Sequence, residues 1–285
     1  MSIEVKNLTH IYGKNGPYEK VAVDNVSCTF EDGEFIGMIG HTGSGKSTLV
    51  QHLNGILKPT EGTVIYNGID IFDKNTDLRK IRQEVGMVFQ YPESQLFEET
   101  VYKDIAFGLN NYGIKGDEAD IKIHNAAKMV DLDYDLLQKS PFELSGGQKR
   151  RVALAGVIAM EPKVLILDEP AAGLDPAGRI SVLESIKNLH LTRGITVILV
   201  SHSMEDMAKY ASKLVVMNKG KLELTGSPKE VFKNQKQLFE MGLDVPNMCK
   251  VLAKVRALGF DVPESVFDVE ETAQVLCEIL RREKC

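Results

Sequence analysis

A glycine-rich segment between an apolar run and a helical run is the feature that most constrains this fold. Residues 40–48 read GHTGSGKST and satisfy the pattern G-x-x-x-x-G-K-[ST]. The apolar run Phe35–Gly40 predicts a strand before the loop, and the segment Ser47–Asn54 predicts a helix after it. An ordinary glycine-rich turn is the alternative, and the flanking elements disfavour it. The sequence therefore predicts a strand, a phosphate-binding loop and a helix in that order.

Each part of this loop has an expected task. The glycines let backbone N–H groups converge on phosphate, and Lys46 adds a full positive charge to the partial charge of the helix N-terminus. Ser47 is placed to bind Mg²⁺, whereas Thr48 fits packing or capping better than ligation. The backbone of His41 is expected to matter more than its ring. The candidate phosphate-binding residues are Gly40, His41, Thr42, Gly43, Ser44, Gly45, Lys46, Ser47 and Thr48.

The rest of the first 227 residues predicts an α/β fold with a β-rich entry. Entry strands are expected at Ile3–Leu8 and Ala22–Phe30, and the AspGly pair at 32 and 33 predicts a hairpin turn. Further apolar runs suit strands buried on both faces of a mainly parallel sheet, at Val85–Phe89, Val164–Leu167 and Thr196–Val200. Helical periodicity predicts a helical subdomain over about residues 91–160.

The last part of the chain, residues 228–285, predicts an appended helical extension. Apolar residues at helical spacing predict three helices, at Lys229–Met241, Asn247–Leu258 and Val269–Arg282. No run of 18 apolar residues occurs, so any membrane role is expected to depend on a partner.

Two adjacent carboxylates form a second candidate element. The apolar run at 164–167 leads into Asp168 and Glu169, which places both acids at the carboxyl edge of the sheet, beside the phosphate loop. Because neighbouring strand residues point in opposite directions, different tasks are expected: Asp168 on the magnesium side and Glu169 as the base or polariser of the attacking water. Solvated carboxylates at a helix start are the alternative.

A third sequence motif narrows the choice of protein family. Residues 144–148 read LSGGQ before a helix, with Ser145 as the expected N-cap and two glycines that expose amides at the helix's positive end. Alone it could be only a cap. Together with the loop and the acid pair it makes the chain resemble the nucleotide-binding subunit of ATP-binding cassette (ABC) transporters, over residues 1 to about 225. The resemblance implies the P-loop ABC ATPase fold, with an antiparallel β subdomain and a helical subdomain.

Four further positions match this family. The resemblance implies that Tyr12 stacks on adenine, that Gln90 senses Mg²⁺ and the lytic water, that Asp175 lies in the loop that crosses between subunits, and that His202 touches the γ-phosphate. The alternatives are a surface tyrosine, a polar strand end and a buried structural histidine. The catalytic candidates are then Glu169, His202, Gln90 and Lys46, and the metal-site candidates are Ser47, Gln90 and Asp168.

The resemblance also implies a composite site for ATP and Mg²⁺. In the family two cassettes pair head to tail, and each ATP lies between the Gly40–Ser47 loop of one and the Ser145–Gln148 turn of the other, assigned here to Ser145, Gly146, Gly147 and Gln148. Spacing along the chain permits this arrangement and does not show it. The residue at Ala172, where many ABC proteins have serine, leaves the hydrogen bonding of the crossing loop open.

Within the ABC family the chain is similar to energy-coupling factor (ECF) transporter ATPases, and most similar to the second ATPase of heterodimeric pairs. Residues 91–97, residues 40–48, Gln51–Thr60 and Ala172–Arg179 carry this likeness. It implies uptake of vitamins or Co²⁺ and Ni²⁺ with a membrane scaffold subunit and a substrate-binding membrane subunit, at the cytoplasmic face of the cell membrane. Residues 91–97 could hold a partner's helix or merely pack, and the extension could contact the second cassette or merely cap the fold.

The net charge and the absence of heptad repeats help to decide between the possible functions. The chain has 34 Lys and Arg against 40 Asp and Glu, a net charge of −6, which opposes unguided attachment to nucleic acid. A soluble cassette acting on nucleic acid or ribosomes is the main alternative. The ATPase of another ABC importer and a non-catalytic nucleotide-binding regulator are two others. No sustained heptads interrupt the cassette as in chromosome-type ATPases. A transport ATPase with no nucleic-acid partner is the expectation.

Overall fold

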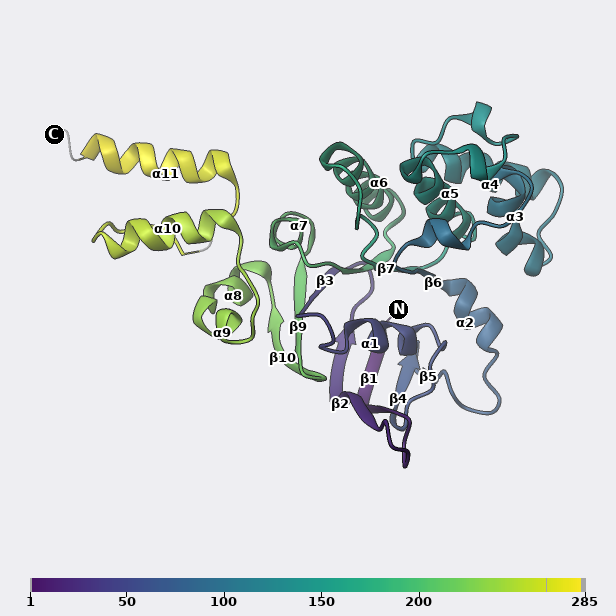
Figure 1. The fold of residues 1–285 in the computed structure, drawn as a ribbon, viewed down its shortest axis with the longest axis horizontal. Coiled ribbons are helices and arrows are strands. Elements are labelled where there is room, and N and C mark those ends of the chain that lie inside the picture. Colours follow the sequence, from purple (N-terminus) through teal and green to yellow (C-terminus); the bar gives the residue numbers. More distant parts are fainter. Residues whose placement is uncertain (1, 265, 283–285) are drawn as a thin grey trace.

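The computed structural model describes residues 2–264 and 266–282, which form two β-sheets covered by helices (Figure 1). The first sheet has four strands in the order β2-β1-β4-β5, and each neighbouring pair is antiparallel. This sheet confirms the predicted β-rich entry. Its strands are β1 (Ile3–Tyr12), β2 (Lys20–Phe30), β4 (Glu61–Tyr66) and β5 (Ile69–Asp70).

The second sheet has six strands in the order β10-β9-β3-β8-β7-β6. All its neighbouring strands are parallel except the hairpin of β9 and β10. The predicted buried strands are confirmed, while β9 and β10 were not predicted. The strands are β3 (Phe35–Ile39), β6 (Val85–Val88), β7 (Val164–Asp168), β8 (Thr196–Val200), β9 (Lys213–Asn218) and β10 (Lys221–Gly226).

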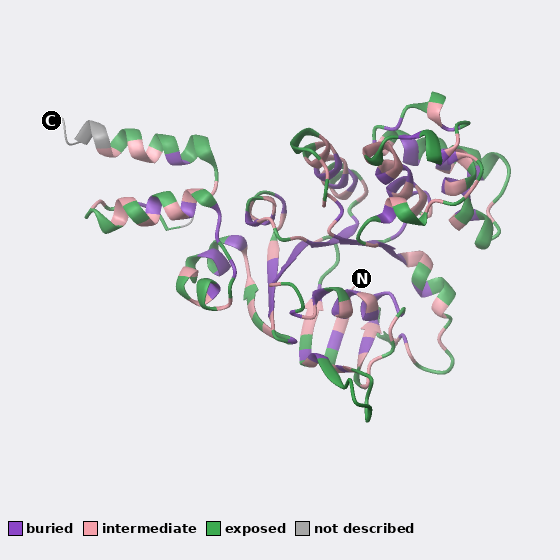
Figure 2. Cartoon of the chain, viewed as in Figure 1, coloured by how far each residue is buried: buried purple, intermediate pink, exposed green. Residues whose placement is uncertain are grey.

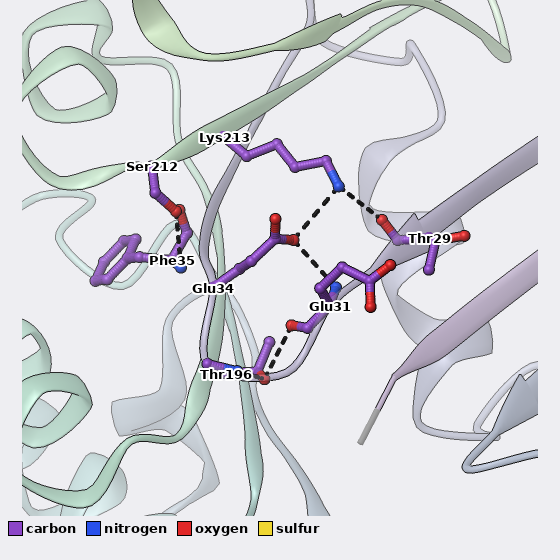
Figure 3. Close-up of polar contacts among 8 residues, drawn as sticks. Thr29, Glu31, Glu34, Phe35, Thr196, Ser212 and Lys213 are labelled. Carbon is purple, nitrogen blue, oxygen red and sulfur yellow. Dashed lines mark hydrogen bonds and ion pairs between the residues drawn. The ribbon is translucent and has the colours of Figure 1, made fainter.

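The predicted hairpin at residues 32 and 33 is wrong. Strand β2 pairs with β1 and β3 pairs with β8 and β9, so this turn carries the chain from one sheet to the other. Local and long-range contacts hold the crossing in place (Figure 3): Glu34 accepts hydrogen bonds from the Glu31 N–H at 3.0 Å, within the turn, and from the distant Lys213 Nζ at 3.4 Å. The Thr196 hydroxyl also donates to the Glu31 carbonyl oxygen.

Helices cover the six-stranded sheet and extend from both ends of the molecule. The helical subdomain and the pair α10 and α11 lie at opposite ends of the long axis (Figure 1). Single 3-10 turns occur at Pro92–Gln95 (η1), Tyr134–Leu136 (η2) and Pro141–Glu143 (η3). The helices are α1 (Lys46–Leu53), α2 (Leu78–Glu84), α3 (Val101–Asn111), α4 (Asp117–Met129), α5 (Gly146–Ile158), α6 (Pro176–Arg193), α7 (Met204–Tyr210), α8 (Pro228–Lys233), α9 (Gln235–Glu240), α10 (Asn247–Ala257) and α11 (Val269–Arg282).

Alternation along the central strands divides the core into two layers. Leu165 and Leu167 of β7 point into a large cluster with the covering helices, whereas Val164 and Ile166 point into a cluster with α1 and the antiparallel sheet. Figure 2 shows the resulting buried band through the centre of the molecule. Because the central strands are buried on both faces, the loops at their ends are held on a rigid base.

The C-terminal segment differs from its prediction in one helix. The expected helix Lys229–Met241 is two helices, because Asn234 (φ −84°, ψ 46°) leaves the helical conformation between α8 and α9. The other two predicted helices are confirmed. Phe232 and Leu238 belong to the large cluster of the main fold, while α10 and α11 enclose a small cluster around Leu252.

Candidate active site

The carboxyl ends of four parallel strands meet along one edge of the six-stranded sheet. β3, β8, β7 and β6 are neighbours in that order, and Asp168 at the end of β7 pairs in register with Val200 at the end of β8. The phosphate loop follows β3, Gln90 follows β6, and His202 follows β8. The fold thus brings these predicted residues to one sheet edge, as open α/β sheets do for ligands.

The phosphate loop has the backbone that its glycines allow. Gly45 caps α1 with φ +102°, and a Cβ at Gly40 would lie 2.4 Å from the Met217 carbonyl oxygen. Lys46 is 6% exposed, and its Nζ donates to the carbonyl oxygens of Gly40 at 2.7 Å and His41 at 3.1 Å. Burial lowers the pKa of Lys46, which the nearby carboxylates partly oppose. The ammonium is therefore held against the carbonyl groups at the start of the loop.

The hydroxyls beside the loop differ in their partners. Ser47 lies close enough to Asp168 to lower the pKa of that carboxyl by hydrogen bonding, so the start of α1 lies beside the end of β7. Ser44 is fully buried, and its Oγ has no hydrogen-bond partner among the described residues. Thr48 Oγ1 lies 3.3 Å from the Tyr12 hydroxyl, in keeping with the predicted packing role. A buried hydroxyl without a partner is costly, so Ser44 is poised for a polar ligand.

The His41 ring has a contact that was not predicted. Its Nε2 lies 3.1 Å from the Asn218 Oδ1 at the end of β9, and its Nδ1 lies 2.8 Å from the Thr42 carbonyl oxygen. The Gly220 N–H also donates to the Ser44 carbonyl oxygen at 2.9 Å. The β9–β10 hairpin therefore supports the phosphate loop from the side.

The two acids have different environments for a reason other than the one predicted. Asp168 ends β7, but Glu169 lies outside the strand with φ +52°, so the simple alternation of strand residues does not apply. Burial raises the pKa of Asp168, opposed by the Ser47 hydrogen bond and the Lys46 charge. Burial and the neighbouring Asp168 raise the pKa of Glu169 to about 7. The two acids are not a pair of solvated carboxylates.

His202 and Gln90 lie on either side of this pair. His202 Nε2 is 3.3 Å from Glu169 Oε1, and burial lowers the pKa of the ring. The imidazole is half exposed and open to a ligand. Gln90 is exposed two residues beyond the end of β6, the strand that pairs with β7. Both side chains are therefore placed to contact a ligand held at the edge of the sheet.

Tyr12 lies beside the loop, where a pocket of about 150 Å³ is lined by both. Lys20 also lines the pocket, and Tyr12 pairs with it in register across β1 and β2. Behind Tyr12, two buried histidines contact each other, His10 Nδ1 and His52 Nε2 at 3.0 Å, and the His10 ring is 4.5 Å from the Tyr12 ring. Lys20 was missed because only strand pairing brings it to the site.

The LSGGQ turn forms a second site at another helix N-terminus. Ser145 and Gln148 make a reciprocal capping box at the start of α5, which confirms the predicted N-cap. A pocket of about 190 Å³ is lined by Ser145, Gly147, Gln148, Arg151, Leu174, Gly178 and Val182. This pocket shares no lining residue with the Tyr12 pocket. The chain thus has two separate pockets at helix N-termini.

Asp175 and Arg179 begin the helix that follows the acid pair. Asp175 is exposed and caps α6 by accepting the Gly178 N–H at 2.7 Å. Arg179 donates to Asp206 of α7 at 2.6 Å, and its charge lowers the pKa of Glu169. Arg179 was not predicted as a site residue, because its contacts cross from one helix to another.

The donor atoms at the sheet edge suit Mg²⁺. The Ser47 hydroxyl and the Asp168 carboxylate are neighbouring hard oxygen ligands, and Mg²⁺ is commonly held by one or two such groups together with phosphate oxygens. Among the described residues, no group of three or more His, Cys, Asp or Glu could hold a metal ion without such help. The residues therefore fit an ion that arrives with a phosphate ligand.

Comparison with known sequences agrees with this geometry. The sequence profile of the ABC transporter family matches residues 23–172, more than half of the chain. The "energy-coupling factor transporter ATP-binding protein EcfA2" of Clostridium perfringens is 54% identical over 282 residues, which cover 99% of each chain.

Solved structures give the same result. The chain is similar to cbiO1 from Clostridium perfringens, described as part of the ABC transporter complex cbiONQ, with TM-score 0.73, 36% identity and coverage of 88% of this chain and 98% of that one. The cassette MJ0796, solved as a dimer in a post-hydrolysis state with ADP and Pi, has TM-score 0.72, 29% identity and coverage of 79% and 98%. Across the part of the chain that the structure describes, no helix combines the length and apolarity that a membrane span needs. The chain belongs to the ABC transporter family and, within it, to the ATP-hydrolysing cassettes of energy-coupling factor transporters.

Proposed function

We propose that this chain hydrolyses ATP at a composite site shared with a second cassette. The main support for this proposal is the pair of small pockets at the N-termini of α1 and α5, which have no lining residue in common. At about 150 and 190 Å³, each is smaller than the usual pocket for a whole drug-sized ligand. A triphosphate held by residues 40–48 of one chain can meet Ser145–Gln148 of another, so ATP would join two subunits. The dimeric MJ0796 cassette with ADP and Pi supports this pairing.

The phosphates and Mg²⁺ would be held at the N-terminus of α1. Lys46 would exchange its bonds to the Gly40 and His41 carbonyls for phosphate oxygens, and the buried Ser44 hydroxyl would gain a partner. Ser47 and Asp168 would hold Mg²⁺, with Gln90 facing the same position. When bound, the ion would neutralise charge that develops on the phosphates.

Glu169 would activate the attacking water. A carboxyl with a pKa of about 7 can accept a proton near neutral pH and release it again. Its Oε1 is buried and accepts no hydrogen bond from the described residues, so a lone pair is available for water. His202, at 3.3 Å, would hold the γ-phosphate side of the site. Asp175, exposed at the start of α6, would face the partner cassette.

The surface after Gln90 would receive a membrane partner. Phe97 and Phe107 are 59% and 44% exposed, and their rings pack edge to face at 5.0 Å. An exposed aromatic pair is suited to a partner's apolar helix. We place the chain on the cytoplasmic face of the cell membrane, bound to a scaffold subunit and a substrate-binding subunit that take up vitamins or Co²⁺ and Ni²⁺. The extension, residues 228–285, would add contacts to the second cassette.

The test is Glu169→Gln in the full-length chain, purified with its accompanying membrane proteins. Hydrolysis should fall by roughly 10²- to 10⁴-fold while ATP-dependent pairing persists, because binding survives and the base is lost. The exposed Glu223→Gln is the matched control and should hydrolyse ATP normally. Ordinary turnover in Glu169→Gln would refute the assignment of the base, and identifying the accompanying proteins tests the proposed partners.

A further inference from the structure

One buried arginine joins three separate segments of the cassette. Arg150 lies in the first turns of α5 and is 3% exposed. Its Nε donates to Glu93 Oε2 at 3.0 Å, and its Nη2 donates to Glu93 Oε1 at 2.8 Å. Its Nη1 donates to the Ala172 carbonyl oxygen. Glu93 belongs to η1, and Ala172 lies between β7 and α6, so a single guanidinium fixes helix α5 to two other segments.

Each of these segments carries part of the proposed site. Glu93 follows Gln90 by three residues, and α5 begins directly after Ser145. Ala172 lies between Glu169 and Asp175. Arg150 therefore connects the residues assigned to the bound phosphate and water with the residues assigned to the partner cassette.

The neighbouring basic residues have other tasks. Lys149 lies over the Phe142 ring at 5.9 Å from its centroid, and Arg151 pairs with Asp131 at 3.1 Å. Neither contacts Glu93 or Ala172 in these interactions. Of the three consecutive basic residues 149–151 of α5, Arg150 is the one that is buried and contacts Glu93 and Ala172.

We propose that Arg150, paired with Glu93, is a positioning residue for ATP hydrolysis. It holds the Gln90 segment, the LSGGQ turn and the loop after Glu169 in one arrangement, so that both halves of the composite site are formed together. This inference rests on the proposed function, because the Ser145 turn and Asp175 act only on a shared nucleotide.

The chemistry of the guanidinium explains why arginine is required. Its planar fork makes two parallel bonds to one carboxylate and still has a third direction for the Ala172 carbonyl. A lysine ammonium carries the charge but cannot make the forked contact. Small misplacements of catalytic groups cost up to about 10²-fold in rate, so a looser anchor should appear in turnover.

The experiment compares Arg150→Lys, Glu93→Gln and the double variant in the full-length chain, purified with its accompanying subunits. Arg193→Lys is the matched control, since Arg193 also pairs with a glutamate, Glu161, at 3.2 Å. Activity is expressed per folded subunit, with folding checked by thermal melting. We expect kcat to fall at least about 10-fold in both single variants, with the KM for ATP within about twofold of the parent. The control should keep its kcat within about twofold.

The double variant separates positioning from independent effects. If Arg150 and Glu93 act as one unit, the double variant should lose no more kcat than the more impaired of the two single variants. Losses that multiply, an unchanged kcat per folded subunit, or a raised KM with normal kcat would each overturn the proposal. A role in stability alone would lower the melting temperature and leave kcat per folded subunit unchanged.

The result remains decisive in two difficult cases. If Arg150→Lys does not fold, Glu93→Gln alone decides, because it retains a hydrogen-bonding amide at the same place. Failure of the proposed function would appear separately, as ordinary turnover in the Glu169→Gln variant. If hydrolysis falls as expected in Glu169→Gln but is unchanged in Glu93→Gln, only the positioning role of Arg150 is rejected.

Discussion

Glu169 Oε1 lies 3.3 Å from His202 Nε2 at the edge of the six-stranded sheet. The side chain is partly buried, and this burial together with the neighbouring Asp168 raises its pKa to about 7. The same environment lowers the pKa of the His202 ring, which favours its neutral form. The pair therefore combines an acid that titrates near neutrality with an imidazole that remains largely uncharged there.

The pH dependence of hydrolysis should report Glu169. Because the base must be ionised, kcat/KM should fall on the acid side with a midpoint near pH 7. Arg179 lowers this pKa through its charge, so Arg179→Ala should move the midpoint to higher pH. The pH profile of ATP hydrolysis measures this, with Arg193→Ala as control. A midpoint that stays in place or moves to lower pH would contradict the assignment.

The stability of the fold should also depend on this carboxyl. Its folded pKa of about 7 exceeds the ordinary value of 4.5, so the stability due to the bound proton is present below pH 4.5 and is lost as pH rises through 7. Glu169→Gln cannot ionise, so it should melt higher than the parent at pH 8 and close to it at pH 4.5. A gain of about 1 kcal/mol corresponds to roughly 2–4 °C in a chain of this size.

Thermal melting at the two pH values provides the measurement for this effect. The exposed Glu223→Gln serves as the control and should show no comparable difference between pH 4.5 and pH 8. An equal shift of the Glu169→Gln variant at both pH values would show that ionisation is not the cause.

Lys46 should act on nucleotide binding itself. Lys46→Ala removes a buried ammonium at the centre of the phosphate loop, so ATP affinity should fall by about 10- to 100-fold, in line with about 1.5–3 kcal/mol for hydrogen bonds to charged groups. Titration with a fluorescent ATP analogue measures it. Lys229→Ala, at an exposed position of α8, is a lysine control away from the loop. Unchanged affinity in Lys46→Ala would argue against its placement.

The C-terminal helices should affect pairing more than folding. Leu258 and Val269 are 77% and 60% exposed at the ends of α10 and α11. If this surface meets the second cassette, Leu258→Glu and Val269→Glu should each weaken dimerisation by about 10-fold or more, by burying a charge at the contact. Light scattering with ATP in the Glu169→Gln background measures the dimer. Leu191→Glu on α6, where Leu191 is 66% exposed, is the control. Dimers as abundant as the control's would reject this contact.

The sequence predicts those parts of the site that follow local rules. Residues 40–48 and the Ser145 turn are recognisable because a glycine-rich loop and a helix cap are built from consecutive residues. The turn at residues 32 and 33 was misassigned because AspGly indicates a turn without indicating which strands it joins. Lys213 and Thr196 decide that from distant positions.

Some site residues were not predicted for the same reason, because distant parts of the chain position them. Lys20 reaches the Tyr12 pocket only through the pairing of β1 with β2. The partners of Arg150, Glu93 and Ala172, are set by how α5 packs against the ends of β6 and β7. Tertiary contacts of this kind leave no periodic signal in the sequence, whereas the strands and helices that create them do.

The packing of Phe232 and Leu238 into the large cluster has a consequence for how the chain comes apart. These side chains share their cluster with Leu214 of β9, so α8 and α9 cannot detach without opening one face of the sheet. Cys249 of α10 is buried in the same cluster, so unfolding of the main body should be cooperative through α10. The apolar side chains of α11 pack in the small cluster around Leu252, so α11 can release earlier. A protease acting on the native protein should accordingly trim the chain from its far end and stop before it reaches Cys249.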